Sequence, residues 1–245
     1  MKRSYVILGV FLILASTFAI EYYTKSRFPA TPLEMVGVPE LTIGAINEYT
    51  CLKELNPVGT YSYMVTGKSG RVYSMESLTD VSIDGNRLQL SSSFTFDEAY
   101  IPIHYMLTAD QGGDTNEFDV IFSEGNVISV VTLAGESVTL SEEFPSGAIL
   151  VENNMPGFWE ILLQSSRLES GKRYTIKAYI PQGGTMFDLE FYVNEGTKTI
   201  TVDGVELECT LIQESTLSLS FYMHDGELVQ MRDTSQDIIF QKLLG

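Results

Sequence analysis

Residues 187–194 read FDLEFYVN, so apolar and polar side chains alternate with a period of two. Successive side chains of an extended strand point to opposite faces, which places the apolar residues of this segment on one side. Residues 217–223 repeat the pattern as LSLSFYM. Such alternation is typical of antiparallel strands with one buried face and one face in water. The C-terminal part of the chain is therefore predicted to form an antiparallel sheet.

Acidic-Gly pairs between alternating runs mark the turns of this sheet. They are Asp84-Gly85, Glu124-Gly125, Asp203-Gly204 and Asp225-Gly226. Glycine adopts the positive φ that tight hairpin turns require, so these pairs are strong hairpin signals. We expect strands and hairpins to dominate the chain from Gly59 onward.

A single helical pattern interrupts the strands. Asn153 or Asn154 is suited to cap the helix and Pro156 to occupy its first turn, and the helix is expected to continue to about Leu168 and stop at Gly171. Its apolar residues include Phe158, Trp159, Ile161, Leu162 and Leu163. The fold is thus predicted to be mainly β: a curved antiparallel sheet or half-barrel of ten or more strands with one amphipathic helix, preceded by an N-terminal hydrophobic helix.

The N-terminus has the pattern of an export signal. Lys2 and Arg3 precede an apolar run over residues 5–20, and such basic residues stay on the cytoplasmic side of a membrane. Extended over residues 5–23, the run approaches the length of a single-pass anchor, which would hold the protein in the cell membrane with its C-terminal domain outside. The alternative is a signal peptide cleaved near Ala19, which would give a secreted protein.

Three segments follow from these patterns. Residues 1–24 are predicted to be the membrane anchor or signal peptide. Residues 25–58 contain four prolines and no sustained period, and are expected to be a tether and edge-packing segment that is partly helical over 41–55. Residues 59–245 are expected to form the extracytoplasmic β-rich domain.

The charge balance excludes one class of partner. The chain carries 15 Lys and Arg against 32 Asp and Glu, a formal net charge of −17. Because phosphate backbones are repelled by such a surface, nucleic-acid binding is not expected. The acidity is suited to solubility at a cell surface, and it is also compatible with a cationic partner or with divalent ions.

No catalytic motif is present in the sequence. Its two histidines, His104 and His224, fit a packed strand position and a hairpin tip, and there is no H-E-x-x-H, C-x-x-C or G-x-S-x-G motif. We therefore expect a protein that is not an enzyme and uses no cofactor. A carboxylate-based hydrolase is the alternative. Its acid and base would come from Glu136, Glu142, Glu143, Asp188 and Glu190.

Two further sets of residues suggest bound groups or crosslinks. Oxygen ligands for Ca²⁺ are offered by Asp110, Asp114, Asn116 and Asp119. Their spacing does not match an EF-hand, and the alternative is a solvated hairpin loop. Cys51 and Cys209 would close a loop of about 160 residues if they formed a disulfide, which would stabilise the fold by roughly 5 kcal/mol. The alternative at Cys209 is a free buried thiol.

A wrapped antiparallel sheet that holds a helix, on an exported chain, resembles the half-barrel of periplasmic lipoprotein-carrier proteins. The segments GKRYTI (171–176), VDGVE (202–206) and YMHDGELV (222–229) are also similar to β-rich domains of uncharacterised exported proteins. The carrier resemblance implies a hydrophobic cavity for acyl chains between sheet and helix.

Four helix residues are candidates to line such a cavity, and the alternative is that they simply close the core. They are Phe158, Trp159, Leu162 and Leu163. The leading functional prediction is a binding or interaction module at the cell surface, with a hydrophobic small molecule or a surface protein as partner. A lipid or lipoprotein carrier is the second prediction, and the hydrolase is the third.

Overall fold

The computed structural model of the chain describes residues 29–83 and 85–244. The expected anchor or signal peptide, including residues 5–23 and the cleavage site near Ala19, lies outside the described residues. Within the described part of the chain, no helix combines the length and the apolar character needed to cross a membrane.

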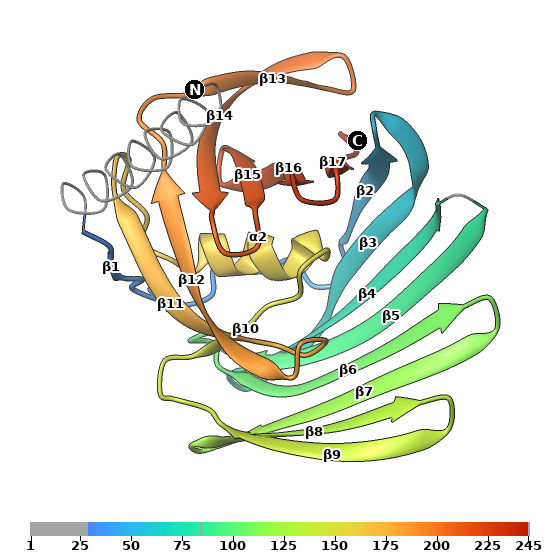
Figure 1. Ribbon diagram of the computed structural model, residues 1–245. Helices are drawn as coiled ribbons and strands as arrows, with labels where there is room; N and C mark the ends of the chain where they lie inside the picture. The colour runs from blue at the N-terminus through green and yellow to red at the C-terminus, as the bar shows by residue number, and fades with distance from the viewer. Residues whose placement is uncertain (1–28, 84, 245) are drawn as a thin grey trace, which may run out of the picture.

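In the described residues, seventeen strands form one continuous sheet (Figure 1). The N-terminal strands are β1 (Thr31–Pro32), β2 (Ile46–Lys53), β3 (Asn56–Ser69), β4 (Val72–Ile83), β5 (Asn86–Asp97), β6 (Pro102–Gln111), β7 (Asp114–Ser123), β8 (Asn126–Leu133), β9 (Glu136–Glu143) and β10 (Ile149–Leu150). Helix α2 (Pro156–Gln164) follows. The remaining strands are β11 (Arg173–Ile180), β12 (Thr185–Val193), β13 (Lys198–Val202), β14 (Val205–Glu214), β15 (Leu219–His224), β16 (Glu227–Asp233) and β17 (Ile238–Lys242).

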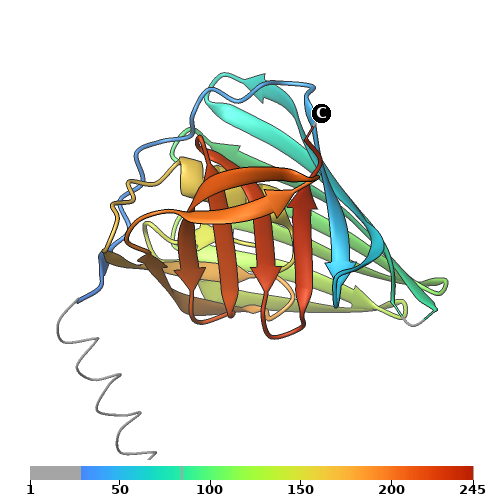
Figure 2. The same ribbon diagram turned by 90° about the horizontal axis from the view of Figure 1, so that it is seen from above.

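The sheet is joined in its middle by strands from opposite ends of the chain. Strand β17 pairs antiparallel with β2, so that Phe240 lies opposite Cys51. Figure 2 shows the C-terminal strands, in orange and red, running side by side into the blue N-terminal strands. Strand β9 forms one edge of the sheet, and β1 and β10, which pair in parallel with β11, lie at the other. The sheet curls around helix α2 but remains open between these edges, as the predicted half-barrel requires.

The predicted hairpins are confirmed. The acidic-Gly pairs connect β4 to β5, β7 to β8, β13 to β14 and β15 to β16, and each pair of strands is antiparallel. Asp203 and Gly204 have φ values of 48° and 79°. Two successive residues with positive φ give the turn whose twist matches that of the flanking strands.

The sheet begins earlier in the chain than Gly59. Residues 46–53 form β2, in which Tyr49 and Cys51 face the core, so the partly helical segment expected over 41–55 is replaced by a strand. Only these two positions of β2 are fully buried, and the flanking Glu48, Thr50 and Lys53 obscure the period of two in the sequence. Within the segment expected to be a tether and edge, residues 29–58 therefore supply β1, β2 and the first residues of β3.

Helix α2 lies on the concave side of the sheet, where strands surround it (Figure 1). Eight of its nine residues are buried, so the helix is not amphipathic as predicted but enclosed. It ends at Gln164 rather than near Leu168. There, the hydroxyls of Ser165 and Ser166 donate to the carbonyl oxygens of Ile161 and Leu162, at 2.6 and 2.7 Å.

The predicted asparagine cap is absent. The N-cap residue is Met155, which makes no side-chain capping hydrogen bond. Instead, the backbone N–H of Gly157 donates to the hydroxyl of Tyr61, a residue of β3, at 3.0 Å. A tertiary contact thus satisfies one of the free N–H groups that every helix N-terminus presents.

Candidate functional site

Buried tyrosines of β2, β3 and the β5–β6 turn hold helix α2 in place. The hydroxyl of Tyr100 donates to the carbonyl oxygen of Phe158 at 2.9 Å. Those of Tyr49 and Tyr63 donate to Oε2 of Glu160, each at 2.7 Å. Tyr49 and Tyr63 occupy inward-facing strand positions, and all three partners lie about 60 or more residues along the chain. These hydrogen bonds fix the position of helix α2 inside the curved sheet.

Glu160 is a buried carboxylate whose hydrogen bonding is satisfied. Besides the two tyrosines, its Oε1 accepts the backbone N–H of Leu228 at 3.2 Å and lies 3.4 Å from Nζ of Lys242. A buried charge is tolerated when it is paired and hydrogen-bonded in this way. Glu160 is therefore a structural anchor between helix and sheet.

Glu152 is a second buried carboxylate, and its bonding is incomplete. Its Oε2 accepts a hydrogen bond from the amide of Gln182, while its Oε1 has no partner. The Tyr105 hydroxyl and the Asn153 side-chain oxygen are also buried without partners in the described structure. Burial raises the pKa of the Glu152 carboxyl to about 7. Orphaned buried polar atoms are rare in native proteins, so this group marks a site.

The Gln182 side chain connects Glu152 to an apolar groove of about 410 Å³, which we call the seam groove. The groove lies between strands β7 to β9 and the turn that joins β11 to β12. Its lining residues are Phe118, Val131, Leu133, Glu136, Val138, Leu140, Pro181, Gln182, Gly183 and Gly184. The seam groove therefore occupies the open side of the half-barrel.

Local sequence explains why this groove is apolar. Phe118, Val131 and Val138 are paired across β7, β8 and β9, so their side chains stand in one row on the inner face. At the β11–β12 turn, Gly184 has a φ of 59°, and a β-carbon there would lie 3.2 Å from Leu140 Cδ1. Glycine thus lets the turn approach edge strand β9 without filling the groove. The arrangement suits binding of an apolar group, with polar contacts at Gln182 and Glu136.

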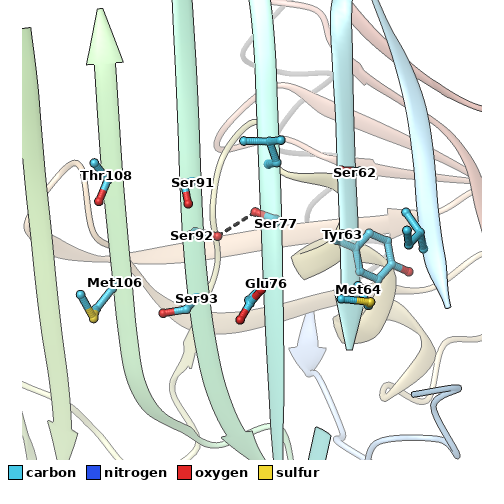
Figure 3. A pocket seen from close by; sticks show the side chains of 12 residues that line it. Ser62, Tyr63, Met64, Glu76, Ser77, Ser91, Ser92, Ser93, Met106 and Thr108 are labelled. Carbon is cyan, nitrogen blue, oxygen red and sulfur yellow. Dashed lines mark hydrogen bonds between the residues drawn. The ribbon is translucent and has the colours of Figure 1, made fainter. Parts of the chain in front are cut away.

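A second hollow, of about 470 Å³, lies on the convex face of the sheet (Figure 3). We call it the outer hollow. It is lined by Ile46, Ser62, Tyr63, Met64, Glu76, Ser77, Leu78, Ser91, Ser92, Ser93, Met106 and Thr108. Most of these residues alternate with buried core residues along β3 to β6, so their side chains point away from α2.

The helix residues considered for acyl binding lie in the filled core. Phe158, Trp159 and Leu162 are completely buried, and Trp159 packs on Phe221 with ring centroids 5.0 Å apart. Leu163 lines a different hollow, of about 540 Å³, beside Gln164 and Ile212. The structure therefore does not bring these four side chains to the seam groove.

The residues considered for Ca²⁺ are spread along the β6–β7 hairpin. Asp110 accepts the Gly113 N–H at 3.1 Å, as in a solvated turn. Asp119 is nine residues further along the chain, in β7, and lies 2.7 Å from His104 Nε2. Across residues 29–83 and 85–244, no group of three or more His, Cys, Asp or Glu is arranged to hold a metal ion.

The two cysteines are both free and buried, so the structure contains no Cys51–Cys209 disulfide. Cys51 is in β2 and Cys209 is in β14, and strands β15, β16 and β17 lie between them. At roughly 4.8 Å per strand, this separation is far beyond the span of a disulfide. Burial raises the pKa of the Cys51 thiol to about 12 and also raises that of Cys209.

The carboxylates considered for hydrolysis do not converge on one cleft. Asp188 pairs with Lys177 at 3.0 Å, and Glu190 pairs with Arg173 at 2.8 Å. The remaining three are on edge strand β9, where only Glu136 reaches the seam groove.

Glu152, Glu160 and Gln182 were missed by the sequence analysis. A usable signal exists for the two carboxylates, because each interrupts an apolar run: AILVE over 148–152 and FWEILL over 158–163. A charge within such a run is rarely buried unless it has a partner. No comparable signal marks Gln182, whose turn is rich in glycine and exposed.

Comparison with known proteins identifies the architecture. No protein-family model matches the chain, and no curated protein matches it in sequence. A β-barrel-like protein of domain of unknown function DUF1849 from Brucella abortus aligns at a TM-score of 0.51 and 10% identity, covering 86% of this chain and 97% of the other. A DUF1089 family protein from Pseudomonas aeruginosa aligns at 0.42 and 10% identity, over 69% and 87%. Neither is described as a lipoprotein carrier. The chain thus shares the overall fold of a β-barrel-like protein.

Proposed function

We propose that this chain is a non-catalytic binding module that acts outside the cytoplasm and holds an apolar ligand in the seam groove. The supporting observation is the groove itself. Its volume of about 410 Å³ falls in the range of small-molecule sites, and its lining is mostly apolar with few polar groups. Sites of this composition bind by excluding water and use the polar groups for orientation.

The position of the groove also favours binding. It lies on the open side of the half-barrel, where β9 pairs only with β8 and the β11–β12 turn covers its inner face. Val138 and Leu140 are 57% and 40% exposed although they point inward. Apolar side chains that face an unfilled interior gain stability when a ligand covers them. The filled space around Trp159 makes the sheet–helix cleft a less suitable place for an acyl chain than this groove.

The proposed location rests on the N-terminal sequence. Lys2, Arg3 and the apolar residues 5–23 support a single-pass anchor in the cell membrane with the domain outside, and cleavage near Ala19 would instead release the domain. A ligand in the groove would then be an apolar small molecule, or an apolar part of a surface protein, encountered outside the cytoplasm.

A photoactivatable alkyl diazirine tests the groove. The full-length gene product would be expressed and purified from cells, with its N-terminal segment kept or cleaved as the cells process it. The protein would be irradiated with the probe, and the labelled peptides would be identified by mass spectrometry. We expect labelling within residues 131–140 and 181–187. Val138→Arg should lose most of it, because a charged, hydrated guanidinium replaces part of the apolar wall and its long side chain occupies the groove.

Val205→Arg is the matched control, because Val205 is 49% exposed at the β13–β14 hairpin and is remote from the groove in sequence and strand order. Labelling spread evenly over the surface, or equal labelling of wild type and Val138→Arg, would refute the groove as a binding site. Native mass spectrometry of the same sample would give the mass of any ligand that copurifies.

A further inference from the structure

The outer hollow arises from a change in side-chain size across neighbouring strands. Ser93 of β5 pairs with Glu76 of β4 on one side and Met106 of β6 on the other. Ser91 lies between Leu78 and Thr108 in the same way. The small hydroxyl side chains form a floor between longer neighbours (Figure 3). The floor therefore offers hydrogen-bonding groups and the rim offers apolar ones.

The rim is unusually apolar for a surface. Ile46, Leu78 and Met106 are 64%, 48% and 46% exposed. The exposed apolar positions continue along the same face to Ile121 and Ile128, which are paired across β7 and β8. Single exposed apolar residues need no explanation, but a group on adjoining strands of one face is typical of a surface that binds another molecule.

The same part of the sheet is strongly acidic. Residues 72–143, which span β4 to β9, contain 13 of the 32 Asp and Glu but only one of the 15 Lys and Arg. That one is Arg87, whose Nε already donates to Asp80 at 2.9 Å. Glu76, which lines the outer hollow, forms no ion pair with any described Lys or Arg. A surface with this charge concentrates cations and repels anions.

We propose that the outer hollow docks a basic, partly apolar polypeptide segment. A Lys or Arg of the segment pairs with Glu76, and its apolar side chains cover Leu78 and Met106. The serine hydroxyls bind polar groups of the segment. This surface is on the opposite face of the sheet from the seam groove, so the inference does not depend on the function proposed above.

Charge and dimensions favour a polypeptide over other occupants. A second copy of this chain would bring the same acidic surface against itself, and anionic lipid surfaces and nucleic acids would be repelled. The apolar positions extend from β3 to β8, five strand spacings or about 24 Å, which is the length of about seven residues of extended chain. A small cation would leave most of this surface uncovered.

The test is the binding of three synthetic peptides to the full-length gene product. The protein is purified with its N-terminal segment kept or cleaved as the cells process it. A 14-residue Leu/Lys peptide carries both features, a Gly/Lys peptide keeps only the charge, and a Leu/Glu peptide keeps only the apolar residues. We expect measurable affinity for Leu/Lys alone, and a decrease of this affinity as NaCl is raised. Carbodiimide crosslinking should join a peptide lysine to Glu76, as identified by mass spectrometry.

Two charge reversals separate a site from general attraction. Glu76→Lys should weaken binding of the Leu/Lys peptide by about tenfold, whereas Glu206→Lys, which changes the net charge equally at an exposed position of β14, should weaken it by less than about twofold. Both positions are exposed, and circular dichroism would verify folding. Equal effects of the two substitutions, equal binding of the Gly/Lys peptide, or no binding of the Leu/Lys peptide would overturn the proposal.

Discussion

Glu152 differs from the other buried acidic residues in how few hydrogen bonds it accepts. Glu214, for comparison, accepts the backbone N–H groups of Glu190, Thr216 and Leu217. Glu152 accepts one, from Gln182, and desolvation of its carboxyl is therefore poorly compensated. Such a group holds its proton at higher pH than an exposed carboxyl does.

Glu152→Gln is expected to remove a pH dependence from stability. The pKa is raised from 4.5 to about 7 in the folded protein, so the fold favours the protonated form. The protonated carboxyl contributes fully to the free energy of unfolding below about pH 4.5. This contribution is lost as pH rises through 7, and the total loss is about 3 kcal/mol. Between pH 5 and pH 8, chemical denaturation should show the variant gaining about 2–3 kcal/mol of stability relative to wild type, since part of the effect is already lost at pH 5. The exposed Glu206→Gln should show no such change, and a constant difference between Glu152→Gln and wild type would contradict the assignment.

The residues of the candidate site were only partly accessible from the sequence. Glu152 ends an apolar run, which is a sign of burial, but its neighbours Tyr105 and Gln182 are 47 and 30 residues away along the chain. Nothing local specifies that these residues meet. The four helix residues chosen for their apolar character are buried because the core needs such side chains, and core packing and ligand binding select the same residue types.

Helix α2 shows which features of an element are local and which come from its surroundings. Its position after Pro156 and its apolar residues were predicted correctly, because propensity and pattern are properties of the segment. Its cap and its length were not, because a hydroxyl from β3 accepts the first N–H and two serines after Gln164 end the helix. Likewise, the strand over 46–53 is recognisable only beside β17 and β3, which supply its pairing.

Gly157→Ala is expected to destabilise the protein although alanine favours helices. A β-carbon at Gly157 would lie 2.6 Å from Tyr63 Cγ and 2.7 Å from the Tyr61 hydroxyl oxygen. The gain in helix propensity is at most about 1 kcal/mol, while forcing a methyl group into a packed core costs about 1–3 kcal/mol and here also displaces the capping hydroxyl. Thermal unfolding should therefore show a lower Tm for the variant.

Gly67→Ala is the matched control for this substitution. Gly67 is in strand β3, and no atom lies within 4 Å of a β-carbon built there. Its free energy of unfolding should change by less than about 0.5 kcal/mol. If Gly157→Ala were as stable as wild type, the close approach of helix and sheet at this point would be refuted.

Across the whole molecule, charge is distributed unevenly. Most of the net charge of −17 belongs to the half of the sheet that contains β4 to β9, where Arg87 is the one basic residue. Repulsion within this half opposes the compact state. The curved sheet was predicted from the alternation of apolar and polar residues and from the turns. That the acidic strands lie side by side is shown by the order of β4 to β9 in the sheet.

Added salt is expected to raise the stability of the whole domain. Between 0.01 and 0.15 M ionic strength, the screening length falls from about 30 to about 8 Å, which reduces repulsion between exposed carboxylates on neighbouring strands. Differential scanning calorimetry should show Tm increasing over this range, equally for NaCl and KCl. A Tm that is unchanged or falls with salt would mean that ion pairs such as Glu98 with Lys68, rather than repulsion, dominate the surface electrostatics.

The pairing of β17 with β2 determines when folding is able to finish. Strands β2 to β9 are joined by short turns, so they form contacts of low sequence separation and assemble as soon as they are made. Residues 238–242, in contrast, meet residues 49–53 only after the entire chain is available. Until then, β2 presents an unpaired edge to other chains. A chain that stalls or is truncated before residue 238 would therefore expose an aggregation-prone strand in the centre of its own sheet.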